Sequence, residues 1–127
     1  MIIGIGCDIV EHSITQELKW DSDPEMLHRF FSRSELELYS KNKTVKFISG
    51  RFAVKEAVLK CIGTGMRDGI SLTEINVLQE KTGAPKIILV GEVNKIAEEK
   101  GINLWHVTIT HSPSYSCAFV IAEGDKT

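Results

Sequence analysis

The sequence predicts an α+β fold in which a mostly antiparallel sheet packs on one long central helix. Three observations lead to this prediction. Residues 45–62 carry apolar side chains at helical spacing over a length that spans a small domain. Two pairs of strand-like segments, one on either side of residues 91–100, each enclose a short turn, which is typical of hairpins. Helices and strands do not alternate regularly, and this argues against a parallel sheet.

The bulk composition indicates a single soluble domain. We expect one domain over residues 1–123 and a disordered tail over 124–127. The net charge of −2 offers no general basic surface for nucleic acid. No apolar run reaches the roughly 18 residues of a membrane span, and a signal peptide is absent, so we expect a cytoplasmic protein without a membrane partner. The three cysteines are scattered and lack CxxC spacing, which argues against zinc.

The N-terminal part is predicted to contain one strand and three helices. Residues 2–6 alternate apolar side chains with glycine, as strands do. Asp23 followed by Pro24 is a typical helix start, and Ser32 or Ser34 can cap the next helix. The predicted elements are a strand over 2–6, a turn at 7–8 and helices over 9–20, 25–31 and 35–39.

The remaining elements follow the long helix, which we expect to end at Gly63. The last strand is almost wholly apolar, so it is predicted to be central and covered on both faces. The predicted elements are a loop at 67–69, strands over 74–80 and 86–90, a helix over 91–100, and strands over 104–111 and 115–122.

Charged side chains on the long helix need an explanation because burial of an unpaired charge is costly. Glu56 and Lys60 are one turn apart, which fits either an ordinary surface ion pair or one wall of a cleft. Lys55 falls within the apolar arc, and we expect it to be buried against a carboxylate. Arg51 lies in the same arc one turn earlier.

Asp8 is the first candidate for a metal ligand. It is expected to lie where the first strand ends, and a carboxylate there could bind a hard cation or cap the following helix. Glu56 could supply a second oxygen, because proteins usually hold Mg²⁺ with one or two carboxylates, water and substrate phosphate.

Two further features each allow two interpretations. His111 ends a strand before a turn, so it is either a hydrogen-bonded structural residue or part of a pocket mouth. Gly63 and Gly65 either end the long helix or let backbone N–H groups approach a phosphate.

These segments together resemble the 4′-phosphopantetheinyl transferases of the holo-[acyl-carrier-protein] synthase type. The similarity lies in the segments Gly4-Ile5-Gly6-Cys7-Asp8-Ile9-Val10-Glu11, Arg33-Ser34-Glu35-Leu36, Gly50-Arg51-Phe52, Phe52 to Lys60, Gly63-Thr64-Gly65 and Ile109-Thr110-His111-Ser112. The motifs occur in the family's order and cover nearly the whole chain. The resemblance implies the fold of the 4′-phosphopantetheinyl transferases, which agrees with the α+β class predicted above.

The resemblance also implies an activity, a cofactor and partners. The implied reaction transfers 4′-phosphopantetheine from coenzyme A to a serine of apo acyl carrier protein, releases adenosine 3′,5′-bisphosphate and supports fatty acid biosynthesis. Mg²⁺ dependence and a homotrimer with active sites between subunits are implied as well. By similarity Asp8 and Glu56 hold Mg²⁺, and Glu56 and Lys60 are catalytic. The implied coenzyme A contacts are Lys43, Arg51, Lys60, Gly63, Gly65, Pro85, His111 and Ser112.

One position departs from the family pattern. Several relatives carry a basic residue three positions after the motif glutamate, where this chain has Ile14. Lys19, Arg29 and Arg33 could supply the basic surface for the acidic carrier protein instead, or they are ordinary solvated charges.

Two other functions use the same residues. A Mg²⁺-dependent phosphohydrolase acting on coenzyme A or a nucleotide would need the same carboxylates with water as the nucleophile. A binding module for coenzyme A or carrier protein would need no turnover, and the intact set of Asp8, Glu56 and Lys60 argues against it.

Overall fold

The computed structural model describes residues 1–65 and 69–125. Within them the strands form a three-stranded sheet of order β1-β5-β4 and a separate hairpin β2-β3, and all of these pairings are antiparallel. This confirms the predicted α+β class. The elements are β1 (Ile2–Glu11), α1 (His12–Glu17), α2 (Pro24–Phe30), α3 (Arg33–Lys41), α4 (Val45–Ile62), the 3-10 helix η1 (Leu72–Glu74), β2 (Ile75–Gln79), β3 (Pro85–Leu89), α5 (Gly91–Glu99), β4 (Ile102–His111) and β5 (Tyr115–Gly124).

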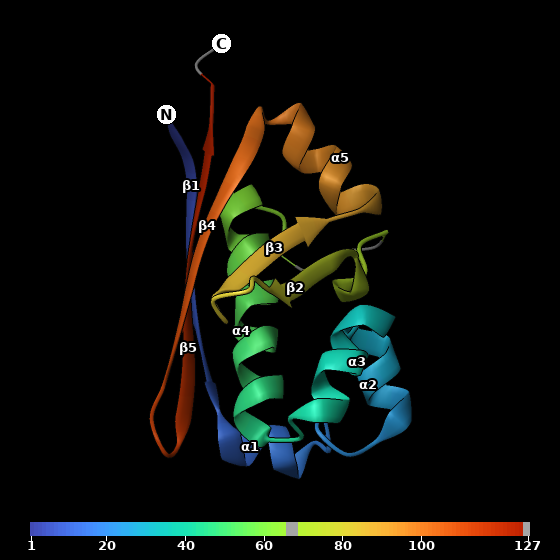
Figure 1. Cartoon of the computed structure of the whole chain (residues 1–127). Coiled ribbons are helices and arrows are strands. Elements are labelled where there is room, and N and C mark those ends of the chain that lie inside the picture. The colour runs from blue at the N-terminus through green and yellow to red at the C-terminus, as the bar shows by residue number, and fades with distance from the viewer. Residues whose placement is uncertain (66–68, 126–127) are drawn as a thin grey trace.

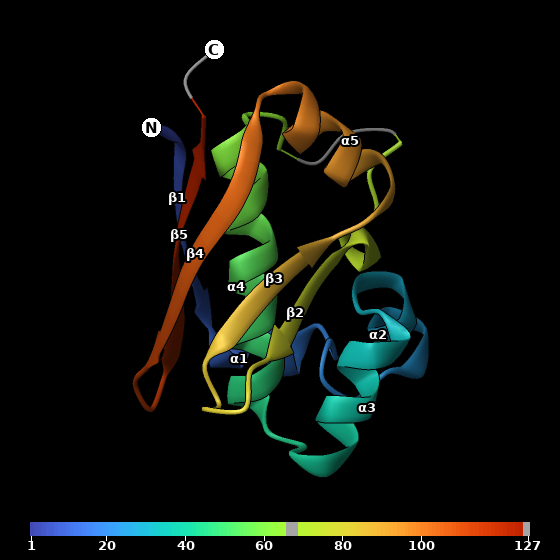
Figure 2. The same ribbon diagram turned by 45° about the horizontal axis from the view of Figure 1, so that its top comes forward.

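Helix α4 is the centre of the molecule, and its bounds are those predicted. Thr44 begins it by accepting a hydrogen bond from the Phe47 N–H, and Gly63 ends it in the left-handed conformation, with φ of 76°. The three-stranded sheet covers one side of α4, and the β2-β3 hairpin and α3 lie on the other (Figure 1). β3 also lies next to β4, which brings the hairpin to the edge of the sheet (Figure 2).

Two glycines let β1 lie directly on the backbone of α4. A Cβ atom at Gly4 would overlap the carbonyl oxygen of Cys61, and one at Gly6 would overlap that of Ala57. The Gly-x-Gly spacing of the first segment therefore has a packing reason, since alternate residues of a strand point to the same face.

The prediction that the chain turns at residues 7–8 into a helix over 9–20 is wrong. β1 continues to Glu11, and α1 is only six residues long. The physical reason is pairing with β5, whose register runs on through Asp8↔Ala118 to Glu11↔Tyr115. The apolar side chains over 9–20 fit helical spacing, but these hydrogen bonds to a strand about 110 residues later override it.

The prediction that β5 is the central strand is confirmed. The prediction that both faces of β5 are covered is wrong for the single chain. Ala118 and Val120 are buried against α4, whereas the outer face is open and Phe119 is 42% exposed. Exposed apolar side chains of β1, Ile5 and Ile9, share this outer face. β5 also continues past Ala122, since the Gly124 N–H donates to the Met1 carbonyl at 2.9 Å.

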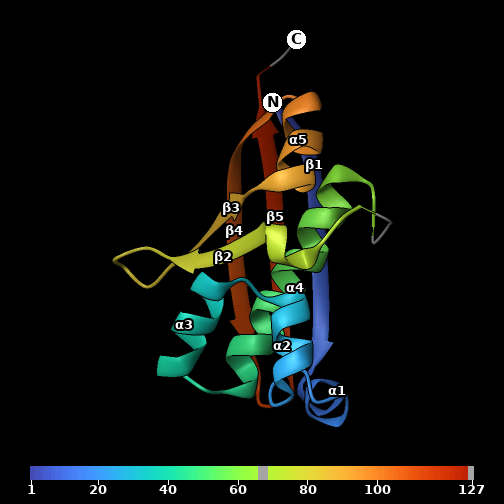
Figure 3. The ribbon, with the colours of Figure 1, turned by 90° about the vertical axis from the view of Figure 1, so that its right-hand side faces the viewer.

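The short helices α1, α2 and α3 gather where α4 begins (Figure 3). A full capping box joins Ser32 and Glu35 at the start of α3, and Asp23 caps α2 ahead of Pro24 as predicted. The Trp20 ring stacks on Phe52 of α4 with centroids 4.4 Å apart. In the described ranges, no helix combines the length and apolarity that crossing a membrane requires. The predicted loop at 67–69 and the predicted tail fall partly on residues 66–68 and 126–127, which lie outside those ranges.

Candidate active site

Asp8 lies in the middle of β1 on the face that packs against α4. It follows Gly4 and Gly6 at two-residue spacing, so its side chain points toward the helix. The alternative role of Asp8 as a helix cap is wrong, because α1 begins after Glu11 and the chain at Asp8 is still extended. The carboxylate is held near α4, and 20% of its side chain is exposed.

Lys60 joins α4 to β1 at this point. Its ammonium group donates to the Cys7 carbonyl at 2.8 Å and to Asp8 Oδ1 at 3.2 Å. The ion pair of Lys60 is therefore with Asp8 rather than with Glu56, the partner that an ordinary i,i+4 pair would use. The Lys60 side chain is 53% exposed, so its charge is also accessible to a bound anion.

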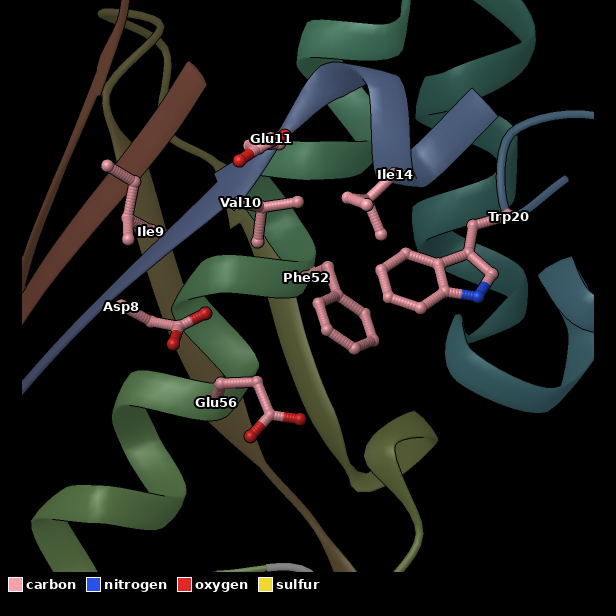
Figure 4. Close-up of a pocket in the computed structure, with 8 residues that line it drawn as sticks. All are labelled: Asp8, Ile9, Val10, Glu11, Ile14, Trp20, Phe52 and Glu56. Atoms are coloured by element: carbon pink, nitrogen blue, oxygen red, sulfur yellow. The ribbon is translucent and has the colours of Figure 1, made fainter. Parts of the chain in front are cut away.

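Glu56 faces the same cleft as Asp8 (Figure 4). Burial and the nearby Asp8 carboxylate raise the pKa of Glu56, while the Lys60 ammonium lowers it. The cleft has a volume of about 360 Å³. Besides Asp8 and Glu56 it is lined by Ile9, Val10, Glu11, Ile14, Trp20 and Phe52.

The two carboxylates suit a hard divalent cation. Asp8 raises the pKa of Glu56 because the two negative charges repel each other, and a cation between them would relieve that repulsion. No group of three or more histidine, cysteine, aspartate or glutamate side chains that could hold a metal ion was found over residues 1–65 and 69–125. A cation held here would therefore take two protein oxygens and complete its shell with water and phosphate, as Mg²⁺ commonly does.

A second pocket of about 440 Å³ contains three of the predicted coenzyme contacts, Arg51, Pro85 and His111. The Arg51 Nε donates to the Val77 carbonyl at 3.2 Å, and its guanidinium lies 3.6 Å above the centre of the Phe47 ring. Burial lowers the pKa of Arg51 to about 10, although Glu35 opposes the shift, so the side chain stays cationic at neutral pH.

The two pockets share no lining residue. Arg51 and Glu56 are five positions apart on α4, which separates them by roughly 140° around the helix axis. The structure thus brings Asp8, Glu56 and Lys60 together in one place, and Arg51, Pro85 and His111 in another. A single chain does not unite all the predicted site residues.

The other predicted coenzyme contacts line neither of these two pockets. Gly63 and Gly65 are exposed beyond the end of α4, with φ of 76° and 57°. Lys43 is exposed between Asn42 and Thr44, which both line the second pocket. The Ser112 hydroxyl accepts hydrogen bonds from Ser114 N–H at 3.4 Å and Tyr115 N–H at 3.1 Å, so it shapes the β4-β5 turn.

The three candidates for carrier docking are all exposed, on neighbouring short helices and the turn after α1. Arg33 lies 3.9 Å from Glu37, and both side chains are largely open to solvent, which makes this a weak pair. Lys19 precedes Trp20 of the 360 Å³ cleft and has a φ of 59°, and Arg29 lies in the last turn of α2.

The expected burial of Lys55 against a carboxylate is confirmed. Its ammonium lies 2.7 Å from Glu35 Oε1 and also donates to the carbonyls of Leu72 and Ile75. Burial lowers the pKa of Lys55, while Glu35 opposes this shift. Both side chains are fully buried, and Glu35 further accepts from the Val77 N–H at 3.0 Å.

Sequence reasoning missed several residues of both pockets. Thr44, Lys46 and Gln79 line the second pocket, and Trp20 and Phe52 form the apolar wall of the first. Lys46 could have been suspected from its place one turn before Gly50-Arg51, but Gln79 offered no signal because it joins the pocket through the β2-β3 hairpin.

The fold and the site define a phosphopantetheinyl transferase. The family model of the 4′-phosphopantetheinyl transferase superfamily matches residues 4–120, and the chain belongs to this family. A curated relative, the holo-[acyl-carrier-protein] synthase of Klebsiella pneumoniae subsp. pneumoniae, is 37% identical over 96% of this chain and 98% of its own length.

Solved structures agree in fold over nearly the whole chain. The holo-[acyl-carrier-protein] synthase of Neisseria meningitidis is similar with a TM-score of 0.88 at 31% identity, covering 97% of this chain and 99% of that one. The synthase of Bacillus anthracis strain Ames, solved in complex with CoA (3′,5′-ADP), has a TM-score of 0.81 at 29% identity and covers 98% and 99%. Within this class the chain is therefore similar to the holo-[acyl-carrier-protein] synthases.

The first cleft has the parts that phosphoryl-group chemistry needs. Two carboxylates can hold a cation and an accessible ammonium lies beside them, so opposite charges can neutralise a pyrophosphate while its bond is broken. Glu56 has a raised pKa, which makes it a better proton acceptor than an ordinary surface carboxylate.

Proposed function

We propose that this protein transfers 4′-phosphopantetheine from coenzyme A to a serine hydroxyl of apo acyl carrier protein, and that the reaction supports fatty acid biosynthesis. The products are holo acyl carrier protein and adenosine 3′,5′-bisphosphate. The observation that carries the proposal is the grouping of Asp8 and Glu56 in one cleft, with Lys60 paired to Asp8 beside it, in a chain that belongs to the phosphopantetheinyl transferase family.

Mg²⁺ is the proposed cofactor, with Asp8 and Glu56 as its protein ligands. The support is their shared cleft and the raised pKa of Glu56, which is due first to burial and then to repulsion by Asp8. When bound, Mg²⁺ would neutralise the pyrophosphate and make the attacked phosphorus more electrophilic. Lys60 would stay close enough to Asp8 to hold that carboxylate in place while offering its third N–H, which is not used by Cys7 or Asp8, to a phosphate oxygen.

The proposed reaction breaks a phosphoanhydride bond of coenzyme A and forms a phosphoester bond to serine. The serine oxygen forms a bond to the phosphorus that carries pantetheine, and the bond from that phosphorus to the bridging oxygen of the pyrophosphate breaks. Glu56, or a water held by it, accepts the serine proton, and its raised pKa suits that role. Lys60 stabilises the charge that develops on the leaving adenosine bisphosphate.

We also propose a homotrimer in which each active site lies between two subunits. The separation of the two pockets within one chain supports this, because a coenzyme that needs both must meet them on different copies. The outer face of the sheet supports it too, since Ile5, Ile9 and Phe119 are exposed there and would be buried by association.

Lys19, Arg29 and Arg33 form the proposed docking surface for the acidic carrier protein. All three are exposed on the side of the molecule where the short helices gather. Ile14 is 39% exposed and lines the catalytic cleft, so an apolar contact replaces the basic residue that several relatives have at this position.

One assay separates this function from coenzyme A hydrolysis. The protein is mixed with coenzyme A, Mg²⁺ and an apo acyl carrier protein, and the carrier is then weighed by mass spectrometry. Transfer adds one phosphopantetheine to the carrier. Breakdown of coenzyme A in the absence of carrier would indicate a hydrolase instead, and no change in either would rule out both activities.

A further inference from the structure

A buried histidine and serine that the proposed reaction does not use lie behind His111. His12 begins α1 and is 5% exposed, and Ser116 of β5 is fully buried. The Ser116 Oγ lies 2.8 Å from His12 Nε2 and 2.7 Å from His111 Nδ1. The three side chains therefore form a continuous hydrogen-bonded chain from α1 through β5 to the second pocket, which His111 lines.

The direction of each hydrogen bond follows from one carbonyl. His12 Nδ1 lies 3.1 Å from the oxygen of Pro113, and a carbonyl oxygen can only accept, so the Nδ1 of His12 carries a proton. In a neutral imidazole the other nitrogen is then an acceptor, so His12 Nε2 accepts the Ser116 O–H. The serine has no second proton to give, so it accepts the N–H of His111 Nδ1.

Both rings have reasons to be neutral. The hydrogen-bond partners of His12 are a carbonyl and a hydroxyl, neither of which compensates a buried positive charge. Burial and the positive charges of Lys46 and Arg51 lower the pKa of His111. A neutral His111 with its proton on Nδ1 has a bare Nε2.

We propose that His12 is a positioning residue that acts through Ser116 to hold His111 in its Nδ1–H form. The inference rests on the proposed function, because it assigns a ligand contact within the coenzyme pocket. Nε2 of His111 then accepts a hydrogen bond from a hydroxyl or N–H group of coenzyme A.

Gly50 gives His111 the space for this arrangement. A Cβ atom at Gly50 would lie 2.9 Å from His111 Cε1 and 3.6 Å from its Nε2, so the ring packs closely on the backbone of α4. The ring is thus held by α4 on one edge and by Ser116 on the other, and its orientation is fixed before a ligand binds.

Nuclear magnetic resonance of the free protein tests the proposal directly. Long-range ¹H–¹⁵N spectra of ¹⁵N-histidine protein distinguish the two neutral forms of each ring, at a pH at least one unit above the ordinary imidazole pKa of about 6.5. We expect His12 and His111 both to carry the proton on Nδ1. A His111 ring protonated on Nε2 in the unaltered protein would overturn the proposal.

Variants test whether His12 sets the form of His111. In His12→Leu the Ser116 hydroxyl is free to donate to His111 Nδ1, so His111 should shift to the Nε2–H form. His12→Gln keeps an acceptor for the serine and should restore Nδ1–H. Should His12→Leu fail to fold, Ser116→Ala should give a mixture of forms at His111 while His106, paired with Glu123 elsewhere, stays unchanged. An unchanged tautomer of His111 in a folded His12→Leu or Ser116→Ala protein would contradict the proposed role of His12.

The ligand contact is read separately from the tautomer. Ser116→Ala should weaken coenzyme A binding, measured by calorimetry, by about threefold to tenfold, and Ser114→Ala in the exposed turn should leave it unchanged. Equal affinity of Ser116→Ala and the unaltered protein would overturn the assigned contact. The tautomer of His111 is measured without any transfer reaction. A protein that transfers no phosphopantetheine can therefore still show the expected tautomer, so the proposed function and the proposed role of His12 can fail separately.

Discussion

Lys60 donates a hydrogen bond to Asp8 over 3.2 Å, joining the C-terminal half of α4 to the middle of β1. The two residues are 52 positions apart, and they meet because Gly4 and Gly6 let the strand lie on the helix backbone. The packing of β1 on α4 therefore positions the proposed metal ligand Asp8, the proposed catalytic carboxylate Glu56 and the proposed phosphate-binding cation Lys60 at once.

Gly6→Ala should disturb the fold and the site together. Its new methyl group would overlap the Ala57 carbonyl, so β1 must move away from α4. We expect a loss of about 1–3 kcal/mol in the free energy of unfolding, measured by urea titration, and a lower transfer rate in the protein that remains folded. Unchanged stability would show that the strand does not depend on this close contact.

Asp8→Ala should lose activity through the metal. We expect the transfer rate to fall by at least about 10–100-fold at low Mg²⁺, since even outer-shell partners of metal sites contribute that much, and to recover partly at high Mg²⁺. Asp125→Ala, at an exposed position just after β5, is the control and should behave as the unaltered protein. Normal activity of Asp8→Ala at low Mg²⁺ would refute the assignment of Asp8 as a ligand.

Lys55→Met should destabilise the protein without touching the cleft. Removal of Lys55 leaves the Glu35 carboxylate buried without its cation, and a broken buried ion pair typically costs about 3–5 kcal/mol. Lys95→Met on the exposed surface of α5 should change stability by less than about 0.5 kcal/mol. Equal melting temperatures of the two variants would contradict a structural role for the pair.

Two inactive variants should restore activity when mixed, if active sites lie between subunits. Arg51→Gln damages the second pocket and Glu56→Gln damages the first. When the two are refolded together in equal amounts, about one quarter of the sites, one half times one half, would have both pockets intact. If the mixture is no more active than the separate variants, the prediction that active sites lie between subunits is wrong.

The sequence predicts the elements whose signals are local. The bounds of α4 and the start of α2 at Pro24 follow from caps and spacing within a few residues. The course of β1 could not be predicted in this way, because Asp8 to Glu11 are extended only through pairing with β5. The partner of Lys55 could be predicted by type but not by identity, since Glu35 reaches it from another helix.

The same limit applies to the site. The family resemblance names the residues, and the structure brings Asp8 and Glu56 into one cleft. Spacing along α4 does not show that Arg51 belongs to a different pocket, because the sheet and the hairpin decide which side of the helix each pocket occupies. The link from His111 through Ser116 to His12 joins three elements and has no sequence signature.

The most direct test of the account is the transfer rate of Glu56→Gln. Carrier protein is incubated with coenzyme A and saturating Mg²⁺, and its mass is followed over time with the unaltered protein, with Glu56→Gln and with Glu99→Gln, an exposed control on α5. We predict that Glu56→Gln remains folded but loses about 10²–10⁴-fold in rate, while Glu99→Gln keeps full activity. Transfer by Glu56→Gln at the rate of the unaltered protein would contradict the catalytic role of this cleft.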